Sequence, residues 1–385
     1  MTRLMPCRPR RRGFALPTAI IALVLLSALV AGALFVSTEE LHAGRGDVAD
    51  QRALAVAEWA LARAIGAWDP QRNTRDTVGR AVIILDDASA PNERVVVTAT
   101  RVQRRSVWLS AEAMATGDGR AARARHAIAA SLRLVGVSVA EQAALTALGG
   151  VTVDRGIIDG RDAGGSSDAS GVCADDERAD AAGIALPDVS RVTCVDCASF
   201  SGTGVFGNPP IDSSVPPPGD SAAAGARAAW RGALDARATI DIAGGTLSTR
   251  PAVVNGECDR TDPLDWGDPS GATSCADYYP VIHVRGNTTV AAGSVGQGVL
   301  LVDGSLRIEP SARFEGVVVV SGDVLVAGTG AEIVGVVVAA DGGGTGTSVV
   351  SDGGAIRFGR CAVRRAVLGS ARLERTPVRW WTELR

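Results

Sequence analysis

The first 36 residues constrain the fold of this chain more than any other segment. A leader with five arginines ends at Gly13, and an uncharged apolar run of 23 residues extends from Phe14 to Val36. At the helical rise of about 1.5 Å per residue, this run spans roughly 34 Å, enough to cross a bilayer. The arginines favour a cytoplasmic N-terminus, so the rest of the chain is expected on the other side of the membrane.

The order of these features differs from that of an ordinary secretory signal, in which a shorter apolar core precedes the cleavage site. Here the natural cleavage site lies between Gly13 and Phe14, so the apolar run would stay on the mature protein. A basic leader, a glycine, a phenylalanine and a retained apolar helix resemble the type IV prepilins, which a prepilin peptidase cleaves and N-methylates. A plain signal anchor is the alternative.

Thr18 departs from the pattern of that family. It would be the fifth residue of the mature chain, where most pilins carry a glutamate that is thought to pair with the N-terminal amine of a neighbouring subunit. A charge without a partner costs several kcal/mol in lipid, so this glutamate can be absent only where no neighbouring amine needs it. A subunit at the tip of a filament meets that condition. In this family, the K-type minor pseudopilin of type II secretion is a subunit of that kind. The resemblance implies three partners, which are the prepilin peptidase, other pilin or pseudopilin subunits and inner-membrane lipid.

Residues 37–70 are predicted to continue as a periplasmic helix that ends at Asp69-Pro70. The residues of its apolar face are spaced seven, four and three apart: Leu54, Leu61, Ile65 and Trp68. The stretch from Arg52 to Leu61 is similar to the Ala-Ala-Glu-Ala-Gly-Leu stretch of PilX-type minor pilins. Since a glycine costs about 1 kcal/mol within a helix, Gly44 and Gly46 predict a break or bend beyond the membrane span.

Residues 71–136 are predicted to form a small antiparallel β domain packed on this helix, the head expected of a pilin-like α+β unit. The segment contains four strand-like runs, the last of which alternates apolar and polar residues in part. These runs are Ala81–Leu85, Arg94–Thr98, Ser106–Ser110 and Ala122–Leu134.

Residues 281–385 carry a repeat. Val299–Ile308 is echoed by Val317–Val326, and a third copy begins at Val336, so that the starts are 18 and 19 residues apart. This period is typical of one coil of a parallel β-solenoid, with valine and leucine facing inward and Gly/Asp turns between strands. Residues 137–159 are a possible first coil, and Trp380-Trp381 would belong to a C-terminal cap. An ordinary β-sandwich is the alternative.

Residues 160–280 form an excursion rich in Gly, Ser, Asp and Pro, with too little apolar content to pack alone. Six cysteines remain after leader removal, and in an exported chain they are disulfide candidates. They are Cys173, Cys194, Cys197, Cys258, Cys275 and Cys361. Cys258 and Cys275 are the favoured pair. Cys194 and Cys197 have the spacing of a redox or zinc half-site, but loop-like residues follow them and no second close pair is present.

Composition argues against binding of nucleic acid. All 39 basic residues are arginines, and loss of the leader shifts the formal charge from −3 to −8. A mildly acidic mature chain lacks the clustered positive charge that phosphate backbones require. We therefore expect no nucleic-acid partner.

Motifs for catalysis, cofactors or metals are not recognised. Gly202–Gly207 satisfies GxGxxG, yet no apolar strand precedes it and Pro209 follows where a helix should start. The three histidines have no nucleophile context: His42, His126 and His283. Three aspartates fall in successive turns, where a calcium ladder is the alternative to simple turn formation: Asp303, Asp323 and Asp341.

The sequence thus predicts an α+β protein with a long membrane-spanning helix, a small antiparallel β head and a solenoid-like repeat domain with a disulfide-bearing insertion. The resemblance implies a non-enzymatic minor or tip subunit of a type IV pilus or secretion pseudopilus. It would reside in the inner membrane with a periplasmic ectodomain, or on the cell surface within a pilus. The alternatives are an anchored adhesin-like surface protein and an anchored β-helix enzyme acting on polysaccharides.

Overall fold

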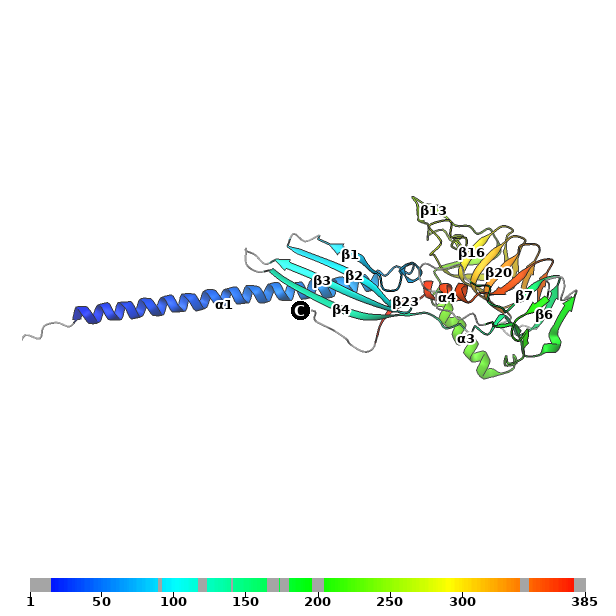
Figure 1. Cartoon of the computed structure of the whole chain (residues 1–385), viewed down its shortest axis with the longest axis horizontal. Coiled ribbons are helices and arrows are strands. Elements are labelled where there is room, and N and C mark those ends of the chain that lie inside the picture. Colours follow the sequence, from blue (N-terminus) through cyan, green and yellow to red (C-terminus); the bar gives the residue numbers. More distant parts are fainter. Residues whose placement is uncertain are drawn as a thin grey trace, which may run out of the picture.

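A helix, an antiparallel sheet and a parallel β-solenoid follow one another along the long axis of the molecule (Figure 1). The computed structural model describes residues 15–88, 92–116, 123–139, 141–164, 173, 180–195, 204–339 and 346–376. The predicted α+β class, with its long apolar helix and parallel repeat domain, is confirmed. Gly13, Phe14 and the expected cap residues Trp380 and Trp381 lie outside the described residues.

Helix α1 runs from Ala15 to Gly66, which corresponds to about 78 Å. Its residues 16–45 are exposed, whereas its C-terminal part packs on the antiparallel sheet. The buried contact face consists mainly of alanines: Ala49, Ala53, Ala57, Ala60 and Ala64. These small side chains let the helix axis lie close to the sheet. The larger residues of the predicted face border the same core, with Leu61 inside it and Leu54, Ile65 and Trp68 at its edge.

The predicted break at Gly44 and Gly46 is wrong, because α1 is continuous through both positions. Each glycine costs about 1 kcal/mol of helix propensity. A break would remove several backbone hydrogen bonds and require a second helix nucleation, which is less favourable than two tolerated glycines.

The antiparallel sheet has the strand order β1-β2-β3-β4-β23 in the described part of the chain. Its strands are β1 (Ala81–Asp87), β2 (Glu93–Gln103), β3 (Ser106–Thr116), β4 (Arg123–Val135) and β23 (Arg372–Arg375). The four predicted runs are therefore confirmed as strands, apart from Ala122, which lies outside the described residues. Strand β23 was not predicted, because Arg-Leu-Glu-Arg is a short edge strand without an apolar alternation.

The whole solenoid is inserted between two neighbouring strands of this sheet. The chain leaves the sheet after β4 and returns to pair with it through β23. Between them lie β5 (Ala143–Ala147), β6 (Gly150–Asp154), β7 (Ile157–Asp159), β8 (Ala182–Ala185), β9 (Val192–Val195), β10 (Gly204–Phe206), β11 (Ile211–Asp212) and helix α3 (Ser221–Asp235). They are followed by β12 (Ile240–Leu247), the hairpin of β13 (Val253–Val254) and β14 (Glu257–Cys258), β15 (Val281–Val290), β16 (Val295–Val302), β17 (Leu306–Ile308), β18 (Arg313–Val320), β19 (Val324–Ala327), β20 (Glu332–Ala339), β21 (Thr347–Ser351), β22 (Ala355–Phe358) and helix α4 (Arg360–Gly369).

The predicted repeat register is confirmed. Val299 pairs with Val317, and Val317 pairs with Val336, in parallel strands β16, β18 and β20. The 18- and 19-residue spacings are therefore the lengths of two successive coils.

The stacking order of the coils differs from their order along the chain. Strands β5 and β6 pair with β20 and β21, so residues 143–154 follow the C-terminal repeats in the stack. They complete one coil together with β22, which pairs with β20 alongside β5. From this composite coil the stack continues through β7, β8 and β9 to β10 and β11. Helix α3 then leads to β12, which pairs with β15 at the opposite end of the stack.

Residues 160–280, expected as an excursion, thus contribute strands β8 to β12 to the solenoid. Most of these strands have only two to four residues, too few to show a periodic apolar pattern. Their pairing partners are supplied by the neighbouring coils.

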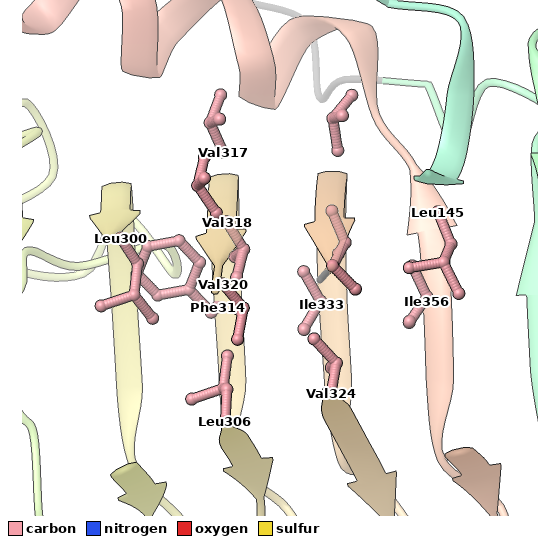
Figure 2. Close-up of a cluster of buried hydrophobic side chains, with 14 of the residues drawn as sticks. Leu145, Leu300, Leu306, Phe314, Val317, Val318, Val320, Val324, Ile333 and Ile356 are labelled. Carbon is pink, nitrogen blue, oxygen red and sulfur yellow. The ribbon is translucent and has the colours of Figure 1, made fainter. Parts of the chain in front are cut away.

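The valine-rich runs are buried on both faces. Val317, Val318, Val319 and Val320 are all 0% exposed, with the solenoid interior on one side of the strand and α4 packed across β16, β18 and β20 on the other. A parallel strand covered on both faces reads as a continuous apolar run. In Figure 2, Phe314, Val320 and Ile333 from one row of strands meet Leu306 and Val324 from the facing row.

Candidate functional site

The N-terminal half of α1 is an exposed apolar surface. Its most apolar 18-residue window has a mean hydropathy of 2.8 and is 0% buried, so the helix is long and apolar enough to cross a membrane. Leu16, Ile20 and Leu23 are each more than half exposed, and Thr18 lies among them on the helix surface. A surface of this kind needs lipid or other apolar helices around it.

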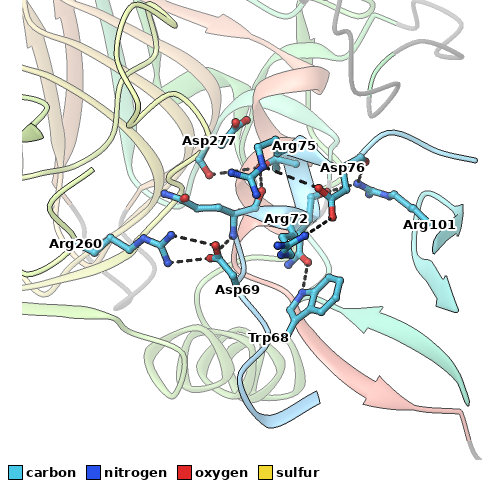
Figure 3. Close-up of polar contacts among 11 residues, drawn as sticks. Trp68, Asp69, Arg72, Arg75, Asp76, Arg101, Arg260 and Asp277 are labelled. Carbon is cyan, nitrogen blue, oxygen red and sulfur yellow. Dashed lines mark hydrogen bonds and ion pairs between the residues drawn. The ribbon is translucent and has the colours of Figure 1, made fainter. Parts of the chain in front are cut away.

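The C-terminal end of α1 leads into a polar junction that joins the helix, the sheet and the solenoid (Figure 3). After Trp68 and Asp69, the short helix α2 (Arg72–Arg75) packs against α4. Asp69 accepts two hydrogen bonds from Arg260 of the solenoid domain, at 2.9 Å and 3.2 Å, and a third from the backbone N–H of Gln71. This bidentate pair links the end of α1 directly to the solenoid.

Asn73 is a buried side chain that makes three hydrogen bonds at the junction. It is 1% exposed, and its amide nitrogen donates to the carbonyl oxygens of Leu368 and Ala371, at 2.8 Å and 2.9 Å. Its amide oxygen accepts from the indole N–H of Trp68 at 2.8 Å. One buried side chain therefore connects the end of α1 to the last turn of α4 and to the segment that leads to β23.

Arg101 on β2 holds the same region from the side of the sheet. It is 3% exposed and donates to the carbonyl oxygens of Asn73, Asp76 and Arg104. Since all three acceptors are backbone groups, the guanidinium fixes the path of the chain around α2 and at the β2–β3 turn.

A disulfide loop orients Arg260. The bond joins Cys258 to Cys275, the pair that the sequence favours. Within the loop Trp266 is fully buried, and its ring meets Phe314 edge-on with centroids 6.3 Å apart. The loop is thus anchored in the solenoid core, and Arg260 projects from it to Asp69.

A second disulfide joins Cys173 to Cys361 in α4. Cys194 is also disulfide-bonded, whereas Cys197 lies outside the described residues. Cys258, Asp265 and Cys275 lie close enough to one another to suit a metal ion. In this structure the two sulfurs form the disulfide, so neither is available as a thiolate ligand.

The remaining candidates from the sequence are distributed over the molecule. His126 contacts Asp50 of α1 at 2.7 Å, and His42 is exposed on α1. His283 lies between Asp235 of α3 and Asp303, at 2.8 Å and 2.9 Å. These contacts tie α3 to the solenoid. Asp341 of the predicted turn series lies outside the described residues.

The Asp69–Arg260 pair predicts a pH dependence of the junction. Burial raises the pKa of Asp69, but the hydrogen bonds from Arg260 and Gln71 and the charges of Arg260 and Arg75 outweigh it, so the net pKa is lowered. The stabilisation is therefore present above the pKa of an unfolded aspartate, about 3.9, and is lost as the pH falls through the lower native value.

We expect Asp69→Asn to be less stable than the wild type at pH 7 in urea unfolding, with the difference shrinking below about pH 4. Asp86→Asn, at the exposed pair with Arg94, is the matched control and should change stability little. A difference between Asp69→Asn and wild type that stays constant down to about pH 2 would contradict the role of this pair.

The junction residues were missed by sequence reasoning. For Arg101 a signal exists, because Val95, Val97 and Ala99 precede it at every second position and all face the core. An arginine in the next inward position marks a buried polar anchor. For Asn73 the sequence offers no comparable signal.

The described residues define a class of protein, which is an α+β chain with a membrane-length helix, a helix-packed sheet and a solenoid inserted into that sheet. No protein-family model matches the chain, and no curated protein is similar to it in sequence. Among solved structures, it is similar to the competence-associated pilin ComZ from Thermus thermophilus, with 14% identity and a TM-score of 0.21. The comparison covers 89% of this chain and 96% of that one. A likeness at this level assigns no function.

Proposed function

We propose that this chain is a non-enzymatic, pilin-like subunit that enters a type IV pilus or a related secretion pseudopilus as a minor or tip component. The observation that carries the proposal is α1, which is apolar and exposed over its first half and packed on an antiparallel sheet over its second. Such a helix can move from lipid into a bundle of like helices without exposing apolar surface to water.

The N-terminal sequence supports the same assignment. The basic leader and the Gly13-Phe14 step ahead of the apolar run resemble a prepilin processing site. The proposed partners are therefore a prepilin peptidase, inner-membrane lipid before assembly, and other pilin or pseudopilin subunits afterwards. The proposed location before assembly is the inner membrane, with the sheet and solenoid in the periplasm.

The solenoid and Thr18 favour a terminal place in the filament. The inserted domain occupies the end of the molecule away from the exposed helix (Figure 1), where it would extend a tip but crowd a shaft of closely packed copies. Thr18 lacks the carboxylate with which a shaft subunit would pair with its neighbour. An anchored adhesin-like protein that never enters a filament remains the second candidate, since a solenoid offers a broad binding surface.

Immunogold labelling of filaments tests the tip placement. We expect low stoichiometry, labels at filament ends and little effect of Thr18→Glu on assembly, because a terminal subunit has no neighbour above it to use the charge. Labels spread evenly along filaments would refute the tip placement. Normal filament assembly after deletion of the gene would instead favour the adhesin-like candidate.

A further inference from the structure

A cavity of about 560 Å³ lies where the sheet meets the solenoid. Its walls come from Gln103–Arg105 at the β2–β3 turn, from Ser138, Val139 and Glu141 after β4, and from α4. This volume falls within the range of small-molecule sites in proteins. Neither Asp69 nor Arg260 lines this cavity, and none of its walls belongs to the exposed half of α1.

The cavity is lined by more positive than negative charge. Arg104, Arg105 and Arg364 line it, and Glu141 is the acidic residue among the lining groups. Glu141 is already engaged by two guanidinium groups, those of Arg360 at 3.2 Å and Arg364 at 3.8 Å. Among the described residues, Arg105 has no carboxylate within salt-bridge distance, so positive charge is left over.

The pKa of the Arg364 guanidinium is lowered, mainly by burial. The charges of Arg104 and Arg105 lower this pKa further, while those of Glu141 and Asp162 partly offset the shift. Like charges held together in a partly buried cavity are relieved by a bound anion.

The arginines are presented by backbone that is fixed in place. The Arg104 carbonyl oxygen accepts from the buried Arg101 at 2.5 Å, and the Arg105 carbonyl oxygen accepts from the Leu134 N–H at 2.8 Å. On the opposite wall, α4 is tethered by the disulfide between Cys361 and Cys173. A fixed backbone on both walls removes the main-chain part of the ordering cost when a ligand binds.

A second cavity at the junction, of about 310 Å³, provides a useful contrast. It is also lined by three arginines, but their guanidinium groups are already used. Arg237 donates to the Val135 carbonyl oxygen, Arg372 donates to that of Ala236, and Arg260 pairs with Asp69. The larger cavity differs in Arg105, which has no carboxylate within salt-bridge distance among the described residues, and this difference makes it the better anion site.

We propose that the cavity between the β2–β3 turn and α4 binds a small organic oxyanion, with Arg105 and Arg364 as its main contacts. Val139, Val363 and Val367 supply an apolar wall for the carbon skeleton of such a ligand. A guanidinium group can form two parallel hydrogen bonds to either a carboxylate or a phosphate. The proposed ligand therefore carries one of these two oxyanions on a carbon skeleton of about the size of a sugar.

Isothermal titration of the full-length protein in detergent micelles tests this site with three probes, which are glucuronate, glucose 6-phosphate and neutral glucose. We expect saturable binding of one or both anions and none of glucose, and the better anion identifies carboxylate or phosphate as the preferred group. Arg364→Gln and Arg105→Gln should each weaken binding by roughly tenfold or more. Arg307→Gln, at an exposed arginine paired with Glu309, is the matched control and should leave binding unchanged.

Arg105→Gln changes an exposed turn residue, so it keeps the test decisive if Arg364→Gln fails to fold. Absence of binding of both anions up to about 10 mM would overturn the proposal, because even weak specific sites bind in the millimolar range. Equal affinity of wild type and Arg105→Gln would overturn it as well. Neither result depends on whether the protein enters a filament.

Discussion

Gly316→Ala is expected to destabilise the solenoid by roughly 3 kcal/mol or more. Gly316 pairs in register with Gly298 and Gly335, and the three residues have φ values of 134°, 109° and 143°. In this region a Cβ atom is strained, and at Gly316 it would overlap the Gly298 carbonyl oxygen and lie 3.1 Å from the Ala366 Cβ of α4. Neither neighbour can move, because one is sheet backbone and the other a packed helix.

Thermal unfolding followed by circular dichroism measures this effect, and a fall in the solenoid midpoint of roughly 6–12 °C is expected. Gly232→Ala in α3 is the matched control. A Cβ there meets no atom within 4 Å, so this variant should be unchanged or more stable by up to about 1 kcal/mol. Equal midpoints for Gly316→Ala and wild type would show that position 316 does not require a glycine.

Asn73→Ala is expected to lower stability by about 3 kcal/mol and to loosen the junction between helix and solenoid. The substitution leaves the carbonyl oxygens of Leu368 and Ala371 and the Trp68 N–H without their buried partner. Faster limited proteolysis between α1 and β1, and a broader particle-size distribution in small-angle scattering, would report the loosening.

Asn287→Ala provides the control for this substitution. Asn287 is exposed and accepts one hydrogen bond, from the Ser305 N–H at 2.9 Å, so its loss should cost less than about 1 kcal/mol. If Asn73→Ala matched Asn287→Ala in stability and protease resistance, the junction would not depend on Asn73.

The parts of the fold that could be predicted from sequence are those with local periodicity. The 23-residue apolar run defines the exposed half of α1, and the valines at 299, 317 and 336 define both the coil length and the strand register. Gly298, Gly316 and Gly335 recur with the same spacing and all have positive φ, a regularity that the sequence analysis did not use.

The parts that could not be predicted depend on contacts between distant segments. Nothing local indicates that β5 stacks on β20, almost 200 residues later, or that β23 returns to β4. The coil formed by β5, β6 and β22 has no repeat in sequence, because β5 and β6 lie far from β22 along the chain. Asn73 is likewise defined only by the carbonyl groups that α4 and the segment after it bring to it.

N-terminal mass spectrometry of the protein purified from its native membrane is the most direct test of the proposed pilin-like role. We predict that the mature chain begins at Phe14, with an N-methyl group on its amine, and retains the whole apolar run to Val36. An intact Met1, or a cut beyond Val36 that removes the apolar run, would contradict the assignment.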